Sequence, residues 1–310
     1  AWVPEEAGGV GGSLELGFNL IRQAAGFAVP VPLVDTMVAN LVLAHSGLDV
    51  AETCAVLLFD GGELPVLDGG VVNGLIEHAP GAPAESLLVV PVMDSDGVRV
   101  ATFTADHLSV ERRESLAGEP RIRAILDAAS PLALSPVVDG MTKDGLWQFG
   151  ALVRASQIAG AMEKINDLTV NYVKERHQFG RPLGKFQAIQ HKVADIAGES
   201  ALASAAVEQG VRMLSRAGEP FAGDRVVFLP AATAKVVTSE GVAVVSRLAH
   251  QCHGAMGFSF EYPLQQYSRR LWAWREEYGS EFYWSERIGL SVASEIDGTS
   301  MLGGQVWDCV

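Results

Sequence analysis

Residues 175–187 read Glu-Arg-His-Gln-Phe-Gly-Arg-Pro-Leu-Gly-Lys-Phe-Gln, and this stretch ends two long helical patterns at once. Before it, residues 146–175 contain no proline and carry apolar side chains at close to helical spacing. Glycine and proline in the stretch stop the first helix, and a second apolar face begins directly after it. Helices joined by such a short turn pack as an antiparallel pair, so Arg176 and Gln178 should lie at the tip of a helical hairpin.

This tip has the residue types of a site for a phosphate and a flat ring. Arg176 offers a guanidinium fork, Gln178 offers an amide, and Phe179 gives the tip an apolar anchor. Composition alone favours a simpler alternative, in which Arg176 caps the last carbonyls of its own helix. The residues leave both interpretations open.

The amino-acid composition indicates an ordered protein with a large hydrophobic core. Of the 310 residues, 48% are hydrophobic and 19% are charged, which allows two or three subdomains and a subunit interface. The 23 basic and 37 acidic residues give a net charge of −14. That charge argues against a nonspecific binder of nucleic acid or of anionic membranes, although a local arginine group can still hold an anion.

The cysteines and the hydropathy predict a cytoplasmic location. Cys54, Cys252 and Cys309 are far apart and odd in number, as expected of reduced thiols. No CxxC or histidine-rich spacing is present, so we expect no metal. No uninterrupted apolar run of about 20 residues and no basic-then-apolar leader is found, so we expect no membrane span.

The first half of the chain changes character near residue 53. Residues 1–52 contain two helical runs, and residues 53–138 predict a small antiparallel β domain. Four strands are expected there, at 55–59, 86–92, 98–104 and 121–126. Asp-Gly and Asn-Gly pairs near residues 60, 68, 73 and 96 are hairpin signals.

Residues 139–310 predict an antiparallel four-helix bundle, because long apolar-periodic patterns alternate with short connections. The helical patterns span about 145–176, 185–216, 225–252 and 264–277, with a further amphipathic piece at 281–295. The tail 298–310 has no period, and we expect a loose or interface-bound end. The predicted fold is therefore α+β and mainly α.

Two motifs resemble the acyl-CoA dehydrogenase family. The first is Arg-x-x-Phe-Gly at 176–180, followed by Phe-Gln at 186–187. The second reads Gln-Cys-His-Gly-Ala-Met-Gly-Phe at 251–258, followed by Glu-Tyr-Pro-Leu at 261–264 and by Arg269-Arg270. The resemblance covers most of residues 1–290 and implies that family's fold. It also places Ala1 in the middle of a first domain, so we expect that preceding helices are missing, disordered or cut away.

In that family, these two turns of one subunit reach the pyrophosphate and adenine of a FAD held mainly by a neighbouring subunit. The resemblance therefore implies that Arg176 pairs with the pyrophosphate and that Gln178 and Gln251 donate amide hydrogen bonds. The apolar wall would consist of Phe179, Leu183 and Phe186. The Gly254-Ala255 backbone would approach the phosphates closely because small side chains permit it.

The same comparison indicates what the chain lacks. Between Glu52 and Pro131 there is no Trp and no Thr-Glu-Pro-x-x-Gly-Ser-Asp-like loop, which the family uses to hold the flavin ring. The catalytic glutamate of the family would fall at Gly150 or Tyr278. No catalytic residue is therefore predicted, and Glu277 is only a weak candidate because one residue turns a helical side chain by roughly 100°. Asp297 resembles a family Glu-Gly-Thr turn but comes late in the chain.

The chain thus resembles the non-catalytic subunits of heteromeric acyl-CoA dehydrogenases from actinobacterial steroid and cholesterol side-chain degradation. That likeness implies an α2β2 heterotetramer with a homologous catalytic partner, which shares the FAD and binds most of the acyl-CoA. Two alternatives remain: a self-sufficient homomeric dehydrogenase or oxidase using Glu277, and a non-enzymatic scaffold.

The roles of several other residues stay open from the sequence alone. His253 could contact a flavin phosphate or be structural. Arg269 and Arg270 could meet a partner carboxylate or cap the bundle. The aromatic residues between 272 and 284 fit core or interface packing better than a ligand cage.

Overall fold

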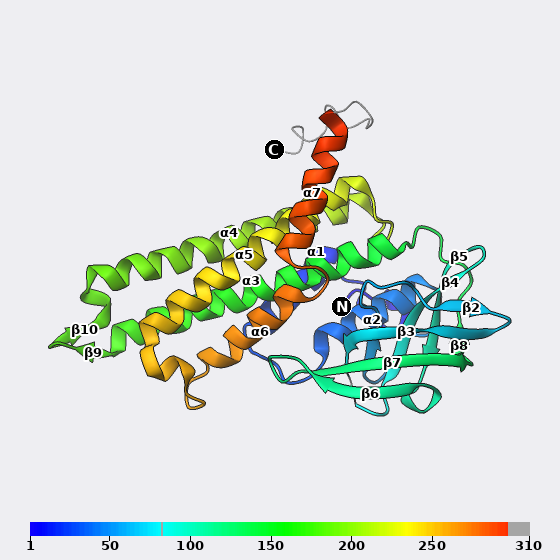
Figure 1. Cartoon of the computed structure of the whole chain (residues 1–310), viewed down its shortest axis with the longest axis horizontal. Helices are drawn as coiled ribbons and strands as arrows, with labels where there is room; N and C mark the ends of the chain where they lie inside the picture. The colour runs from blue at the N-terminus through cyan, green and yellow to red at the C-terminus, as the bar shows by residue number, and fades with distance from the viewer. Residues whose placement is uncertain (82, 297–310) are drawn as a thin grey trace.

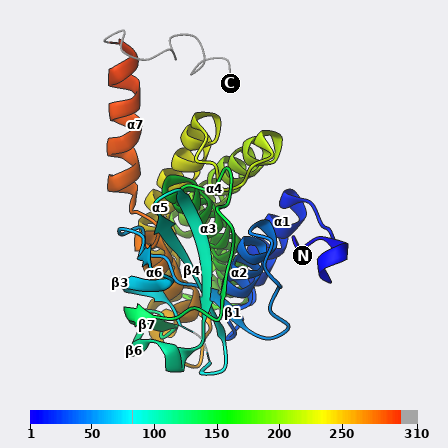
Figure 2. The ribbon, with the colours of Figure 1, turned by 90° about the vertical axis from the view of Figure 1, so that its right-hand side faces the viewer.

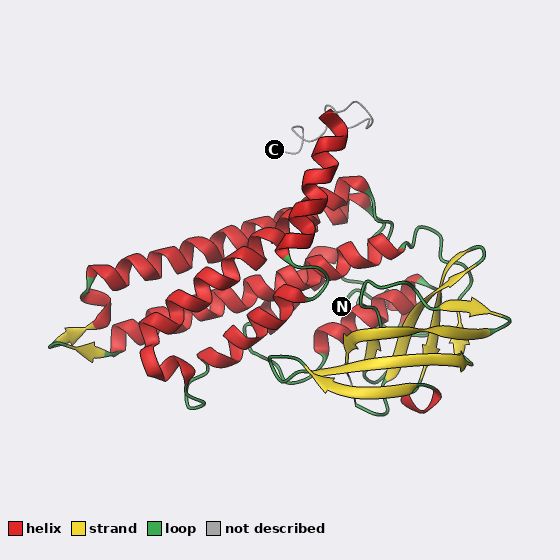
Figure 3. Ribbon diagram, in the orientation of Figure 1, coloured by secondary structure: helices red, strands yellow, loops and turns green. Residues whose placement is uncertain are grey.

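A computed structural model describes residues 1–81 and 83–296. Helices fill one side of the molecule and a twisted sheet fills the other (Figure 3). The chain opens with η1 (Glu5–Ala7), α1 (Leu14–Ala25) and α2 (Leu33–His45). Ser13 begins α1 because its hydroxyl accepts a hydrogen bond from the Leu16 N–H at 3.2 Å.

The β region forms one sheet of eight strands. Their order is β6-β7-β3-β2-β4-β5-β8, and β1 pairs with β4 off this path. All pairs are antiparallel except those of β4 with β1 and β2, which are parallel. The strands are β1 (Ala55–Leu57), β2 (Val66–Asp68), β3 (Val71–Pro80), β4 (Leu87–Asp94), β5 (Gly97–Phe103), β6 (Ser109–Glu114), β7 (Pro120–Ala129) and β8 (Ala133–Leu134), with η2 (Ala105–His107) between β5 and β6.

The hairpin signals in the sequence have mixed outcomes. Asp68 and Asp96 do precede the β2–β3 and β4–β5 turns. The prediction of a turn at Asn73-Gly74 is wrong, because both residues lie inside β3, where the register against β7 shifts. A side chain at Gly74 would come within 2.8 Å of Pro65, so this glycine permits a close approach instead of a turn.

The helix bundle contains four long or medium helices and an extra one. These are α3 (Lys143–Glu175), α4 (Gln187–Ala217), α5 (Arg225–His253), α6 (Leu264–Glu276) and α7 (Glu281–Ile296). Short pieces join them, namely β9 (His177–Gln178), β10 (Arg181–Pro182), η3 (Leu183–Lys185) and η4 (Gly254–Phe258). The predicted helical patterns and the mainly α fold class are confirmed.

Helix α7 stands away from the rest of the bundle (Figures 1 and 2). It is anchored by Trp284, which is fully buried and donates a hydrogen bond from its indole N–H to the Tyr278 carbonyl at 2.9 Å. Asp297 and the tail beyond it lie outside the described residues.

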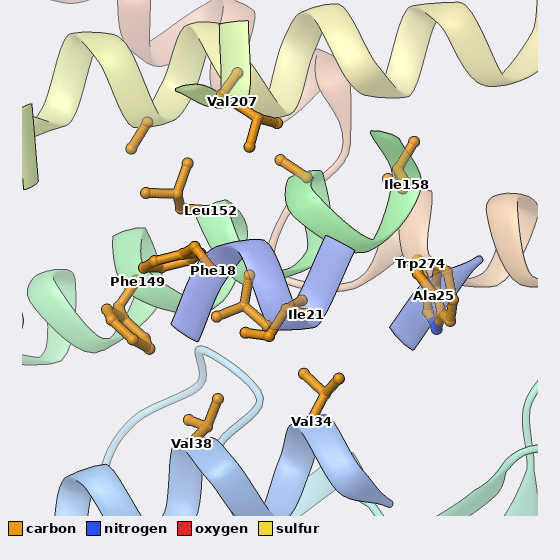
Figure 4. Packing of buried hydrophobic residues seen from close by; sticks show 14 of the residues in the cluster. Phe18, Ile21, Ala25, Val34, Val38, Phe149, Leu152, Ile158, Val207 and Trp274 are labelled. Carbon is orange, nitrogen blue, oxygen red and sulfur yellow. The ribbon is translucent and has the colours of Figure 1, made fainter. Parts of the chain in front are cut away.

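One continuous core joins the N-terminal helices to the bundle. Phe18 and Ile21 of α1 pack against Phe149 and Leu152 of α3, and Val207 of α4 completes this layer (Figure 4). A second cluster of buried apolar residues lies within the sheet region.

Within the described chain, one helical stretch (Arg225–Phe258) is long and apolar enough to span a bilayer, and half of its most apolar window is buried in the structure.

Helices α1 and α3 approach so closely that only glycine fits at residue 160. A methyl group there would lie 2.0 Å from the Arg22 carbonyl oxygen, whereas nothing lies within 4 Å of a methyl group at Gly198 on α4. We expect Gly160→Ala to lower the free energy of unfolding by about 1–3 kcal/mol through overpacking. Gly198→Ala should instead raise it by about 0.5–1 kcal/mol through helix propensity. Urea titration of both variants checks this, and equal effects would contradict the packing.

Candidate functional site

The turn between α3 and α4 is a small hairpin at the end of the bundle (Figure 1). Gln178 pairs with Arg181 across β9 and β10, and the two residues between them, Phe179 and Gly180, have φ values of 50° and 77°. Such a turn suits glycine, but it strains a bulky residue such as phenylalanine. The turn is closed by the Leu183 N–H, which donates to the Arg176 carbonyl at 2.8 Å.

Two polar side chains of this turn, those of Arg176 and Gln178, are exposed and have no partner inside the chain. Within residues 1–81 and 83–296, neither the Arg176 guanidinium nor the Gln178 amide makes a hydrogen bond or ion pair. The alternative that the Arg176 side chain caps its own helix is therefore wrong. Both groups are free to bind a ligand from outside.

One aromatic ring of the turn, that of Phe186, contacts a cation. Phe179 is 91% exposed, and its ring lies 6.1 Å from the half-buried ring of Phe186. The guanidinium carbon of Arg181 lies 4.1 Å from the centroid of the Phe186 ring, which is a cation–π contact. Sequence reasoning missed Arg181, although the Arg-Pro step in the same stretch places it opposite Gln178.

The second turn follows α5 at the same end of the bundle. Gln251 and Ala255 are exposed, and the Gln251 amide has no partner within the described residues. Gly254 has φ 58° and ψ −140°, a conformation that glycine adopts readily, and nothing lies within 4 Å of a methyl group added there. Open backbone of this kind can approach a ligand closely.

His253 is structural. Its side chain is 3% exposed, its ring stacks on Tyr172 at 4.3 Å, and Nδ1 donates to the Ala249 carbonyl at 2.8 Å. Burial lowers its pKa, so the ring is neutral near pH 7. It cannot act as a cation for a phosphate there.

Arg269 and Arg270 also have partners inside the chain. Arg269 donates to the Leu116 carbonyl at 2.9 Å, and Arg270 donates to the Glu119 carboxylate at 3.2 Å. Both partners lie in the loop between β6 and β7. The two arginines therefore fasten the sheet to α6.

Glu277 lies between two guanidinium groups. Its carboxylate accepts a hydrogen bond from the Arg154 Nε at 2.8 Å and pairs with Arg121 on its other oxygen. Arg154 is 2% exposed and also pairs with Asp35 at 3.1 Å. Burial alone would raise the pKa of Glu277, but the two arginines outweigh it and lower that pKa. A carboxylate held in this way is a poor proton acceptor.

The positions expected for a base, Gly150 and Tyr278, touch each other. A methyl group at Gly150 would lie 2.1 Å from the Tyr278 ring, and Tyr278 has a left-handed backbone with φ 55°. Trp147 lies 5.1 Å from the Tyr278 ring and would be 2.3 Å from a methyl group at Gly61. Two glycines thus make room for two aromatic rings between sheet and bundle.

A cavity of about 430 Å³ remains beside these rings. Its wall includes Phe59, Asp60, Arg121, Trp147 and Glu277. The Asp60 carboxylate accepts hydrogen bonds from the backbone N–H groups of residues 62, 77 and 78.

In the described parts of the chain, no group of three or more His, Cys, Asp or Glu residues could hold a metal ion.

Lys235 is a buried residue that sequence reasoning missed. It is fully buried in α5, and its Nζ donates to the Arg275 carbonyl at 2.5 Å and to the Trp274 carbonyl at 3.3 Å. Burial lowers its pKa to about 7. The ammonium group caps the last turn of α6 and so supports the turn that carries Glu277 and Tyr278. The one signal in the sequence was a lysine within an apolar helical run.

Comparison with known proteins agrees with this architecture. Residues 146–281 match the family "Acyl-CoA dehydrogenase, C-terminal domain". Acyl-CoA dehydrogenase IpdE2 of Mycolicibacterium smegmatis is 28% identical over 274 residues, which are 86% of this chain and 76% of that protein. Acyl-CoA dehydrogenase FadE34 of Mycobacterium tuberculosis is also 28% identical and matches 92% of this chain, but this is 39% of its own length.

Two solved structures share the fold. The Tcur3481-Tcur3483 steroid ACAD superposes with a TM-score of 0.80 at 26% identity, covering 95% of this chain and 85% of that chain. The ChsE4-ChsE5 complex from Mycobacterium tuberculosis gives a TM-score of 0.80 at 19% identity, covering 94% and 84%. The latter likeness concerns the fold alone.

The contact between Gly150 and Tyr278 is tested by a double-mutant cycle. We expect Gly150→Ala to destabilise the wild-type chain by about 1–3 kcal/mol, because the new methyl group meets the ring. In a Tyr278→Ala background the same change should be neutral or stabilising. Urea titration of the four proteins gives the coupling energy, and additive effects would contradict the contact.

The ion pairs of Glu277 predict a pH-dependent stability. Glu277→Gln should lower the free energy of unfolding by about 3 kcal/mol at pH 7, since Arg121 and the buried Arg154 each lose one of their two carboxylate partners. The pKa of Glu277 is lowered from 4.5, so its contribution is complete above that pH and is lost as the pH falls further.

The control is Glu276→Gln, whose side chain is 66% exposed. It should change stability by less than about 0.5 kcal/mol. The free energy of unfolding of both variants, measured by chemical unfolding from pH 3 to pH 7, checks this prediction. An equal loss in the two variants, or a loss for Glu277→Gln that does not shrink in acid, would contradict the assignment.

Proposed function

Because residues 146–281 match the acyl-CoA dehydrogenase C-terminal domain and the chain has the acyl-CoA dehydrogenase fold, we propose that it is one subunit of a FAD-dependent acyl-CoA dehydrogenase. In this proposal it supplies the adenine and pyrophosphate part of a FAD site. A homologous catalytic subunit holds the reactive ring. The complex oxidises the α,β-bond of an acyl-CoA thioester.

The observation that carries the proposal is the free Arg176 guanidinium at the bundle tip. Residues 174–187 carry Lys174, Arg176, Arg181 and Lys185 against the single acid Glu175, in a chain whose net charge is −14. A basic turn on an acidic protein attracts an anion locally. Its groups fit a dinucleotide, since they combine charge, amides and aromatic rings.

Each residue then has a definite role. Arg176 pairs with the pyrophosphate, and Gln178 and Gln251 donate amide hydrogen bonds. The side chains of Phe179, Leu183 and Phe186 cover the apolar part of the cofactor. The backbone of Gly254 and Ala255 approaches the phosphates, since nothing lies within 4 Å of a methyl group added at Gly254.

The chain's own cleft supports the assignment of the ring to a partner. When bound, FAD supplies the acceptor for the β-hydrogen as hydride, while a carboxylate with a raised pKa takes the α-proton. Gly150 and Tyr278 offer no carboxylate, and the pKa of Glu277 is shifted in the opposite direction. We therefore assign the base to the partner. The self-sufficient alternative with Glu277 has no favouring observation.

The substrate and the assembly are inferred from relatives. The Tcur3481-Tcur3483 steroid ACAD and the ChsE4-ChsE5 complex have this fold, and each is named for two components. On that basis the partner is a homologous acyl-CoA dehydrogenase chain, the assembly is an α2β2 heterotetramer in the cytoplasm, and the acyl group is a steroid side chain. The acyl-CoA binds mainly to the partner.

Arg176→Ala tests the role of the tip. In the complex copurified with its partner, the variant should bind FAD about 10- to 100-fold more weakly, because a charge-assisted hydrogen bond is lost. The matched control is Arg216→Ala, an exposed arginine in the last turn of α4, at the end of that helix far from the tip. Titration of FAD into the apo complexes measures both. Unchanged affinity in Arg176→Ala would favour the scaffold alternative.

A further inference from the structure

The two turns at the bundle tip belong to different helices. Arg176 and Gln178 follow α3, whereas Gly254 follows α5. A ligand that touches both turns needs them at a fixed separation. The contacts between the last turns of α3 and α5 therefore determine whether the tip can act as one site.

Aromatic rings contribute directly to those contacts. Tyr172, one helical turn before Arg176, stacks on His253 with ring centroids 4.3 Å apart and an interplanar angle of 28°. Its hydroxyl donates to the His253 carbonyl at 3.2 Å. The ring and the backbone of the last residue of α5 are thus both fixed to α3.

A third ring closes the group. Tyr262, just before α6, lies 5.0 Å from the His253 ring and meets the Tyr172 ring edge-on at 5.6 Å. Its hydroxyl donates to the Leu168 carbonyl of α3 at 3.3 Å. The three rings come from three segments, and each segment carries or borders one of the turns.

We propose that Tyr172, His253 and Tyr262 form an aromatic clamp that holds the Arg176–Gln178 turn and the Gln251–Ala255 turn at one separation. They are positioning residues, because their hydroxyl and Nδ1 groups bond to backbone carbonyls of this chain. The functional consequence, tighter FAD binding, rests on the proposed function. The fixed separation of the two turns is independent of that function.

The residue positions make the clamp effective. Gly254 follows His253 directly, so a tilt of the histidine ring moves the start of the second turn. Arg176 lies one helical turn beyond Tyr172, so a shift of that ring moves the first turn. Neither turn has other side-chain hydrogen bonds to the opposite helix within the described residues.

Hydrogen–deuterium exchange on the full chain tests the structural part. In His253→Ala, amides of residues 176–186 should exchange about tenfold faster. In the wild type, local opening of the first turn has to break the stack of Tyr172 on His253, and the variant loses this energetic cost of opening. In His253→Phe, which keeps a stacking ring, exchange should match the wild type. If His253→Ala fails to fold, Tyr172→Leu replaces it with the same expectation, since Tyr172 is only half-buried.

The control for general destabilisation is Val207→Ala, a core change in α4 with a residue that is 3% exposed. It should lower the melting temperature without a selective change at 176–186. The clamp is overturned if exchange there is unchanged in His253→Ala and Tyr172→Leu, or if His253→Phe is as fast as His253→Ala.

FAD titration into the copurified complex tests the consequence. His253→Ala should weaken FAD binding about tenfold, and His253→Phe should restore it. If Arg176→Ala weakens binding but His253→Ala does not, the clamp's effect on binding is overturned and the proposed function stands. If Arg176→Ala leaves binding unchanged, the proposed function fails, and the exchange experiment still decides the clamp.

Discussion

The pairing of Glu277 with Arg121 and Arg154 is the constraint on which the rest of the structure depends. Arg121 lies on β7 and Arg154 on α3, so this carboxylate joins the sheet to the bundle. The burial of Arg154 makes the pairing costly to break, because this buried guanidinium would keep only one of its two carboxylate partners, Asp35. The pairing also fixes the start of the turn after α6, where the Tyr278 ring lies against Gly150. Lys235 caps the C-terminal end of α6 just before this turn.

That turn and the bundle tip use their polar groups in opposite ways. At the turn, Glu277 and Lys235 are satisfied by groups of this chain, and the aromatic rings fill the space between sheet and bundle. At the tip, the side chains of Arg176, Gln178 and Gln251 have no partner among the described residues. The turn after α6 thus uses its two buried charged groups for structure, whereas the bundle tip leaves a guanidinium and two amides free for a ligand.

Sequence reasoning succeeded where the signal was local. The periodicity of apolar residues predicted the helices, and α4 and α5 each end one residue beyond the predicted patterns 185–216 and 225–252. It failed where distant residues decide the outcome. Asn73-Gly74 has the composition of a turn, yet Gly74 lies in a strand because Pro65 packs against it. Periodicity likewise placed Arg154 on an apolar helix, but its partners Asp35 and Glu277 come from opposite ends of the chain. The tip residues were found from a family motif, and their lack of internal partners emerged only in the structure.

We infer that this chain holds the nucleotide end of a flavin and that another subunit performs the chemistry. The visible spectrum and the acyl-CoA oxidation rate should be compared between the chain purified alone and the chain copurified with its catalytic partner. We expect a colourless, inactive chain alone and a yellow, active complex. Oxidation of an acyl-CoA by the isolated chain at an ordinary enzymatic rate would overturn this inference.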